Sequence, residues 1–83
     1  MNESDDQIKK ESIARLAKRI KQLRLEKGHL NYETFAIAHG SSRSQYWRYE
    51  KGEDLRFSSL VRVVNALGVT LEEFFSEGFE YVP

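Results

Sequence analysis

A glycine at position 40 divides residues 31–52 into two short helical stretches, and this division constrains the fold more than any other feature of the chain. Asn31 is a good N-cap for the first stretch, because its side-chain oxygen can accept hydrogen bonds from unpaired N–H groups of the first turn. Ser42 can begin the second stretch in the same way, with Gln45 three residues later completing a capping box. Gly40 supplies the positive φ that a tight turn requires. The segment therefore predicts two short helices joined by a tight turn.

Apolar residues that recur at intervals of three and four indicate a long helix before this segment. We expect this helix to run from about Asp5 to Lys27, with Ser4 and Gln7 spaced as a capping box. Gly28 then ends it, because glycine readily adopts the left-handed conformation that is common just after a helix.

Two further helices are expected in the last third of the chain. One is capped by Ser58 or Ser59 and ends at Gly68. The other is a short final helix, for which Thr70 and Glu73 form a capping box. The apolar residues expected to face the core are Ile13, Leu16, Ala17, Ile20, Leu23, Phe35, Ala36, Tyr46, Tyr49, Leu60, Val63, Val64 and Leu67.

Five helices and no convincing strand predict an all-α protein, a compact five-helix bundle. With 83 residues, of which 40% are hydrophobic, the chain is expected to be one small domain with one modest core. Residues 13–75 are expected to form this domain and residues 1–12 to extend its first helix. Residues 76–83 form an acidic and aromatic tail to which the sequence assigns no structure.

Charge is distributed unevenly along the chain, although its net charge is zero. Residues 8–62 hold all 13 Lys and Arg but only six acids, a net charge of +7, whereas residues 1–7 carry −3 and residues 63–83 carry −4. A basic centre between acidic ends is expected of a nucleic-acid binder whose ends face elsewhere. The alternative interpretation is an ordinary solvated helix surface, which is always rich in charge.

Several classes of protein are excluded by composition. No apolar run approaches the ~20 residues of a membrane span, and the acidic N-terminus is unlike a signal peptide, so a cytoplasmic location is expected. Without cysteine there is neither a disulfide nor a thiolate metal site. His29 and His39 both lie beside glycine in predicted turns, with no partner for nucleophilic or metal chemistry. We therefore expect no enzyme activity, no metal and no cofactor, and His39 is expected to face solvent.

The helix that begins after Ser42 carries side chains suited to the DNA major groove. Because Tyr46 and Tyr49 share its buried face, Arg43, Ser44 and Arg48 fall largely on the other face. Arginine can bond guanine O6 and N7 together, so these three residues are the candidates for reading bases. The residues expected to contact the DNA backbone or to support the reading helix are Asn31, Tyr32, Ser41, Ser42, Gln45, Trp47 and Lys51.

The order and spacing of these residues resemble those of phage-repressor/Cro type (XRE) helix-turn-helix domains. The similarity extends over residues 13–75 and includes Leu23-Arg24, Phe35-Ala36, Gly40, Ser42-Arg43-Ser44, Arg48, Glu50-Lys51-Gly52, Leu60 and Ala66–Phe75. It implies a five-helix, lambda-repressor-like domain of a transcriptional regulator that binds double-stranded DNA, usually as a dimer on a palindromic operator.

The resemblance also implies roles for individual residues. It places base contacts at Arg43, Ser44 and Arg48, and it assigns Ser42 to a cap that contacts phosphate. It further implies that Arg24 and Glu50 form an ion pair that joins the first and third helices and holds the arginine toward DNA. A purely fold-stabilising ion pair is the alternative.

Two residues depart from the family's pattern, and both leave alternatives open. Tyr32 stands where the family commonly has a glutamine that contacts phosphate, and Trp47 stands where a small or polar residue is usual. Each aromatic ring either contacts DNA or packs against the protein.

The main alternative function is that of a protein-interaction module, such as the antitoxin of a toxin–antitoxin pair, which the zero net charge and the aromatic residues of the reading helix favour. The tail presents a similar choice: its aromatic residues contact a homodimer partner, or Phe79 and Tyr81 fold back on the monomer.

Overall fold

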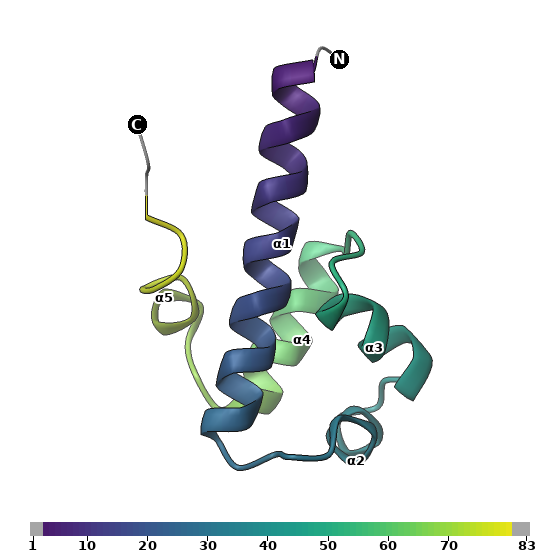
Figure 1. Cartoon of the computed structure of the whole chain (residues 1–83). Coiled ribbons are helices and arrows are strands. Elements are labelled where there is room, and N and C mark those ends of the chain that lie inside the picture. The colour runs from purple at the N-terminus through teal and green to yellow at the C-terminus, as the bar shows by residue number, and fades with distance from the viewer. Residues whose placement is uncertain (1–2, 81–83) are drawn as a thin grey trace.

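The computed structural model describes residues 3–80, and within that range the chain forms five helices and no strand (Figure 1). The helices are α1 (Glu3–Glu26), α2 (Tyr32–Ala38), α3 (Arg43–Glu50), α4 (Phe57–Leu67) and α5 (Leu71–Phe74). The N-terminal half of α1 extends beyond the other helices, while α2 and α3 lie on one side of it and α5 on the other (Figure 1). The predicted all-α, five-helix fold is confirmed.

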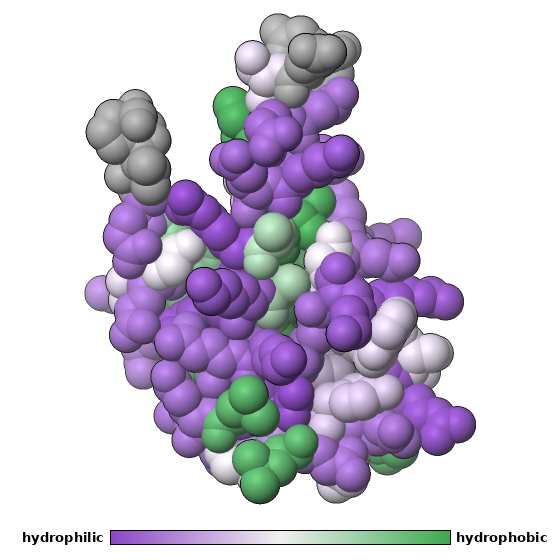
Figure 2. All heavy atoms as spheres, in the orientation of Figure 1, coloured by the Kyte–Doolittle hydropathy of each residue, from purple (hydrophilic) through white to green (hydrophobic). Residues whose placement is uncertain are grey.

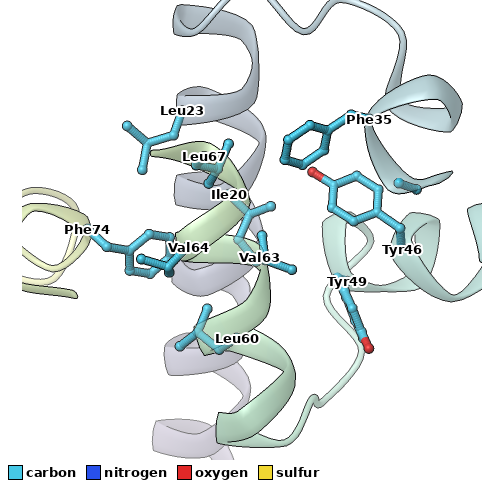
Figure 3. Close-up of a cluster of buried hydrophobic side chains, with 11 residues drawn as sticks. Ile20, Leu23, Phe35, Tyr46, Tyr49, Leu60, Val63, Val64, Leu67 and Phe74 are labelled. Carbon is cyan, nitrogen blue, oxygen red and sulfur yellow. The ribbon is translucent and has the colours of Figure 1, made fainter. Parts of the chain in front are cut away.

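The hydrophobic core lies where α1, α3 and α4 face one another, and Figure 3 shows it as one continuous cluster. Phe74 of α5 closes the cluster on one side, and Phe35 of α2 with Tyr46 of α3 closes it on the other. Every residue predicted to face the core is buried except Ile13 and Leu16, which are half-buried. The three-and-four spacing of apolar residues therefore located the core correctly.

The face of the molecule seen in Figure 2 is mostly hydrophilic. Hydrophobic side chains gather at its lower edge, where α1 ends and α2 follows. The exposed large hydrophobic residues at the end of α1, in the loop after it and in α2 are Leu25, Leu30 and Ile37. Within residues 3–80, no helix combines the length and the apolar character needed to cross a bilayer.

Side-chain caps define the starts of α2, α3 and α5. Asn31 Oδ1 accepts hydrogen bonds from the backbone N–H groups of Glu33 and Thr34, at 2.9 and 3.1 Å. Ser42 Oγ accepts from the backbone N–H of Gln45 at 3.1 Å, which is the serine half of the predicted box. The box at the start of α5 is complete. Each such cap stabilises a helix by about 1 kcal/mol.

Two predicted caps are wrong. α1 already begins at Glu3, so Ser4 lies inside the helix, and the Gln7 amide donates to Glu11 Oε1 at 2.9 Å. α4 begins before Ser58, with Arg56 as a cap that makes no side-chain hydrogen bond. This start allows Leu55, just before the helix, to pack against the core. Burying a leucine is worth more than the ~1 kcal/mol of a serine cap.

Arg19 of α1 holds the C-terminal end of α5, a role that the sequence analysis missed. The side chain is buried, its Nε donates to the Phe74 carbonyl at 2.7 Å, and its Nη2 donates to the Glu73 carbonyl at 2.8 Å. These carbonyls belong to the last turn of a helix, where carbonyls have no partner within the helix itself. Arg19 therefore gives the Phe74 carbonyl a partner, joins Ser76 as a donor to the Glu73 carbonyl, and fixes the short α5 against α1.

The tail folds back on the body of the protein over its described residues. Phe79 is half-buried, and its ring centroid lies 4.8 Å from that of Phe75 and 5.9 Å from that of Phe74. Arg15 Nη1 donates to the Glu80 carbonyl at 2.9 Å. Phe79 thus follows the second of the two interpretations of the tail, whereas Tyr81 lies outside the described residues.

His39 does not face solvent as predicted. It caps the C-terminus of α2, and its ring centroid lies 4.7 Å from Phe35 and 5.7 Å from Tyr46. Nδ1 lies 2.8 Å from the Phe35 carbonyl and therefore donates as N–H, while Nε2 is buried with no partner among the described residues. Burial lowers the pKa of His39 below its ordinary 6.5, and the positive charge of Arg62 acts in the same direction.

We expect this histidine to make folding stability depend on pH. Because its pKa is lower in the folded than in the unfolded state, stability is full above about pH 6.5 and declines as the pH falls below it. His39→Gln should therefore make the unfolding free energy depend less on pH between about pH 7.5 and pH 5.5. Urea denaturation at a series of pH values measures this dependence. Equal slopes for wild type and His39→Gln would contradict the assignment.

Candidate nucleic-acid interface

Two buried tyrosines anchor α3 and determine which of its faces is free. Tyr46 is fully buried and makes an edge-to-face contact with Phe35 at 5.4 Å between ring centroids, and Tyr49 is buried beside it (Figure 3). Burial raises the pKa of Tyr46 well above its ordinary value, so its hydroxyl remains neutral. On the other side of the helix, the side chains of Arg43 and Arg48 are 70% and 58% exposed. The outward direction predicted for both arginines is confirmed.

The turn between α2 and α3 has the predicted geometry, with one correction. Gly40 adopts a φ of 82° and sets the direction of the chain into α3. Ser41, expected to approach a DNA phosphate, is only 8% exposed, and its backbone N–H already donates to the Ala36 carbonyl at 2.9 Å. Ser41 is therefore a residue of the turn, because the tight return of the chain directs it inward. Ser42, the next residue, is exposed at the start of α3.

Arg24 and Glu50 form the predicted ion pair between α1 and α3. Arg24 Nε lies 2.7 Å from Glu50 Oε2 and Nη2 lies 3.1 Å from Oε1, a two-point contact between the guanidinium and the carboxylate. The arginine also donates to the carbonyls of His29 and Leu30, at 2.7 and 3.1 Å. These hydrogen bonds join α1, α3 and the turn that precedes α2.

The environment of this pair favours the fold-stabilising interpretation. The side chains of Arg24 and Glu50 are 6% and 9% exposed. The hydrogen bond to Glu50 is the main reason that the pKa of Arg24 is raised, against the opposing effect of burial. The Arg24 guanidinium is therefore directed at Glu50 and at the carbonyls of His29 and Leu30. Its effect on the exposed arginines is indirect, through the position of α3.

A shallow pocket of about 140 Å³ lies over this ion pair, between α1, α2 and α3. Besides the pair itself, it is lined by Lys21, Tyr32, Trp47 and Lys51. Lys51 Nζ lies 5.4 Å from the centroid of the Trp47 ring, a cation–π contact, and half-buried Tyr32 stacks on Tyr46. Tyr32 therefore packs against the protein, whereas Trp47 remains 46% exposed beside Lys51, and both rings line the pocket. Lys21 is brought here from α1, and sequence spacing alone gave no signal of its proximity.

Each exposed arginine of α3 also lies beside an acid that the sequence analysis did not connect with it. Arg43 Nη1 lies 3.2 Å from Glu33 Oε2 of α2, and Arg48 Nε lies 3.8 Å from Glu53 Oε2 in the loop after α3. The surface around α3 thus alternates basic and acidic groups. Over residues 3–80, no three His, Asp or Glu side chains come together in a way that could hold a metal ion.

We expect the buried ion pair to contribute far more to stability than the exposed ones. Glu50→Gln leaves Arg24 buried without a counter-charge, which should lower the unfolding free energy by about 3 kcal/mol. Glu53→Gln, the matched change in an exposed pair, should cost less than about 1 kcal/mol. Chemical denaturation of the two variants measures both values. A loss at Glu50 no larger than that at Glu53 would show that the buried pair does not hold α3.

A family model described as a helix-turn-helix domain matches residues 15–74. The comparison with curated proteins gives no match, and neither does the comparison with solved structures. The matched range covers more than two thirds of the chain and includes α2, the turn at Gly40 and α3. The chain belongs to the helix-turn-helix domain family.

Proposed function

We propose that this protein is a small transcriptional regulator that binds double-stranded DNA in a sequence-specific manner. In this proposal it works like the phage-repressor/Cro type (XRE) domains it resembles, with residues 42–51 in the major groove. The observation that carries the proposal is the exposure of Arg43 and Arg48 on the face of α3 opposite its buried tyrosines. Direct base recognition requires a helix that packs against the protein with one face and exposes arginine guanidinium groups on the other.

The neighbouring residues suit contacts with the DNA backbone. Ser42 is exposed at the first turn of α3, where a helix N-terminus favours a phosphate. Lys51 is exposed one turn beyond Arg48, and its ammonium lies close to Trp47. Arg43, Ser44 and Arg48 are proposed to read bases. The remaining backbone or supporting residues in this proposal are Asn31, Tyr32, Ser42, Gln45, Trp47 and Lys51, with Lys21 added from α1.

The proposal needs no cofactor and no enzyme activity, and it places the protein in the cytoplasm, where its DNA would lie. The alternative, a protein-interaction module such as an antitoxin, differs in a measurable way. A DNA reader loses affinity steeply as salt rises, because each neutralised phosphate releases bound counterions. A module that binds only protein shows no preference among duplexes.

Two variants distinguish base reading from phosphate contact, with an operator first selected from a random duplex library. Arg43→Ala should weaken binding to that operator by about 1–3 kcal/mol and relax preference at one base pair, because a bidentate contact to guanine is lost. Lys51→Ala should weaken binding to all duplexes alike and lower the salt slope by about one. Fluorescence anisotropy across a salt series measures both effects. An unaltered base preference in Arg43→Ala would contradict its role in recognition.

We also propose that the protein binds its operator as a homodimer, since one small domain covers only one half-site. An apolar groove of about 270 Å³ supports this proposal. We propose that part of a second copy of the chain occupies this groove. The groove is lined by Ser12, Leu16, Leu55, Phe57, Leu60, Phe75 and Phe79. None of these residues belongs to α2 or α3, so a partner seated in the groove would leave the proposed DNA-binding face free.

Sedimentation of groove variants tests this pairing. Phe57 and Phe75 are exposed, so a double change to serine should remove the dimer without unfolding the monomer. Ile37→Ser is the matched control, since Ile37 is also exposed but lies on α2, outside the groove. We expect the control to sediment as the wild type does. A wild-type protein that remains monomeric at every concentration, or a groove variant that remains dimeric, would overturn this assignment.

A further inference from the structure

We infer that residues 3–12 of α1 are the segment of a second copy that lies in the apolar groove, with the two α1 helices crossing antiparallel. The inference rests on the proposed homodimer, and it adds which segment is buried and in which orientation. α1 begins at Glu3, whereas the match to the helix-turn-helix family begins at residue 15. The start of α1 therefore lies outside the range shared with the family, and the proposed base contacts do not account for it.

This segment is exposed along its described length. It extends beyond the other helices (Figure 1), and every residue from 4 to 12 is exposed. Helices in proteins are stabilised mainly by packing an apolar face against another element. Ile8, which is 62% exposed, is the large apolar side chain that this segment offers. A second copy that covers Ile8 would supply the packing that one copy lacks.

The apolar groove continues the stripe on which Ile8 lies. Ile8, Ser12 and Leu16 follow one another at intervals of four residues, so their side chains lie along one side of α1. Ser12 and Leu16 line the groove, which places Ile8 just beyond its end. A groove of about 270 Å³ has room for only a few side chains, whereas a specific interface buries about 800 Å² on each partner. The exposed helix beside the groove can provide the rest of that area.

Symmetry sets the register of the two helices. In a twofold dimer the same surface is buried on both copies, so each groove receives what the other copy inserts. If the helices cross antiparallel at Ser12, the residue four positions before Ser12 in one copy lies beside the residue four positions after it in the other. Ile8 of each copy then lies beside Leu16 of the other, inside the groove.

The charges of α1 favour the antiparallel orientation. Residues 1–7 carry a net charge of −3, whereas residues 12–25 contain five basic residues and no acid. Antiparallel helices bring the acidic start of each copy to the basic half of the other, with Asp6 at the level of the exposed Lys18. Parallel helices would place the two acidic starts together, where like charges repel. Charge therefore selects the orientation that the groove also requires.

Sedimentation of Ile8→Ser beside the wild type tests the inserted residue. The change should raise the dissociation constant of the dimer about a hundredfold, because symmetry removes two buried isoleucines at once. Ile37→Ser is the matched control, since Ile37 is 65% exposed on α2 and should leave the dimer unchanged. On a duplex that carries a single half-site, Ile8→Ser should keep the wild-type affinity, because α3 is untouched.

Cysteine cross-linking tests the orientation, since the chain has no cysteine of its own. Ser12→Cys should form a disulfide between copies on mild oxidation, because Ser12 lies where the helices cross. Ser4→Cys should not. At about 1.5 Å per residue, position 4 lies about 12 Å from the crossing in each copy, on opposite sides. The two cysteines would then be about 24 Å apart, far beyond the ~7 Å between Cα atoms that a disulfide allows.

Dimerisation of Ile8→Ser with the wild-type constant would overturn the inference and leave the groove contact and DNA recognition standing. A weakened half-site affinity in Ile8→Ser would also overturn it, because Ile8 would then support the fold. So would failure of Ser12→Cys to cross-link, or cross-linking of Ser4→Cys, which is the result for parallel helices. A wild-type protein that stays monomeric at every concentration would mean that another partner, or none, covers this face. That result would overturn the proposed homodimer as well.

Discussion

The rest of this structure depends on the packing of the Tyr46 side chain in the core. Its ring is fully enclosed and contacts aromatic rings from α2 and from α3 itself. Aromatic side chains bury a large area through few rotatable bonds, so one such residue fixes the rotation of a short helix about its axis. An eight-residue helix in isolation would be marginal in water. The core contact therefore determines both that α3 forms and which face it exposes.

The arginines of this chain show how one residue type takes opposite roles according to its environment. Arg19 and Arg24 are buried, and their hydrogen bonds go to backbone carbonyls, to Gln22 and to Glu50. Arg43 and Arg48 are exposed and face single carboxylates at the surface. The first two hold α5 and α3 in position. Arg43 and Arg48 have N–H donors that can form hydrogen bonds with a ligand, because breaking a screened ion pair at the surface requires little free energy.

Much of the fold could be predicted from the sequence, because periodicity and caps are local signals. The spacing of Ile20 and Leu23 identified the buried face of α1, and the glycine at 40 identified the turn with its positive φ. Caps were less reliable, as Ser58 shows, because burial of apolar groups around a helix start outweighs one side-chain hydrogen bond. The long-range contacts could not be predicted: Arg19 bonds carbonyls that lie 54 and 55 residues away, and no local pattern indicates them.

The candidate site, like the fold, could be predicted from the sequence only in part. The outward direction of Arg43 and the pairing of Arg24 with Glu50 came from helical spacing and from the resemblance to a family. The sequence did not predict that His39 lies between two aromatic rings, because the sequence around a turn residue beside glycine does not indicate which side chains pack against it. The carboxylate beside Arg43 was missed for a related reason. Its distance depends on the angle between α2 and α3, which the sequence alone does not provide.

We propose that α3 binds DNA with the face opposite its buried tyrosines. A heteronuclear NMR titration of the labelled protein with a library-selected duplex tests it most directly. We expect the largest shifts on the side-chain N–H groups of Arg43 and Arg48 and on the backbone of residues 42–51, while the signals of α5 stay unchanged. Shifts centred instead on Phe57 and Phe75, or no shifts with any duplex, would contradict it.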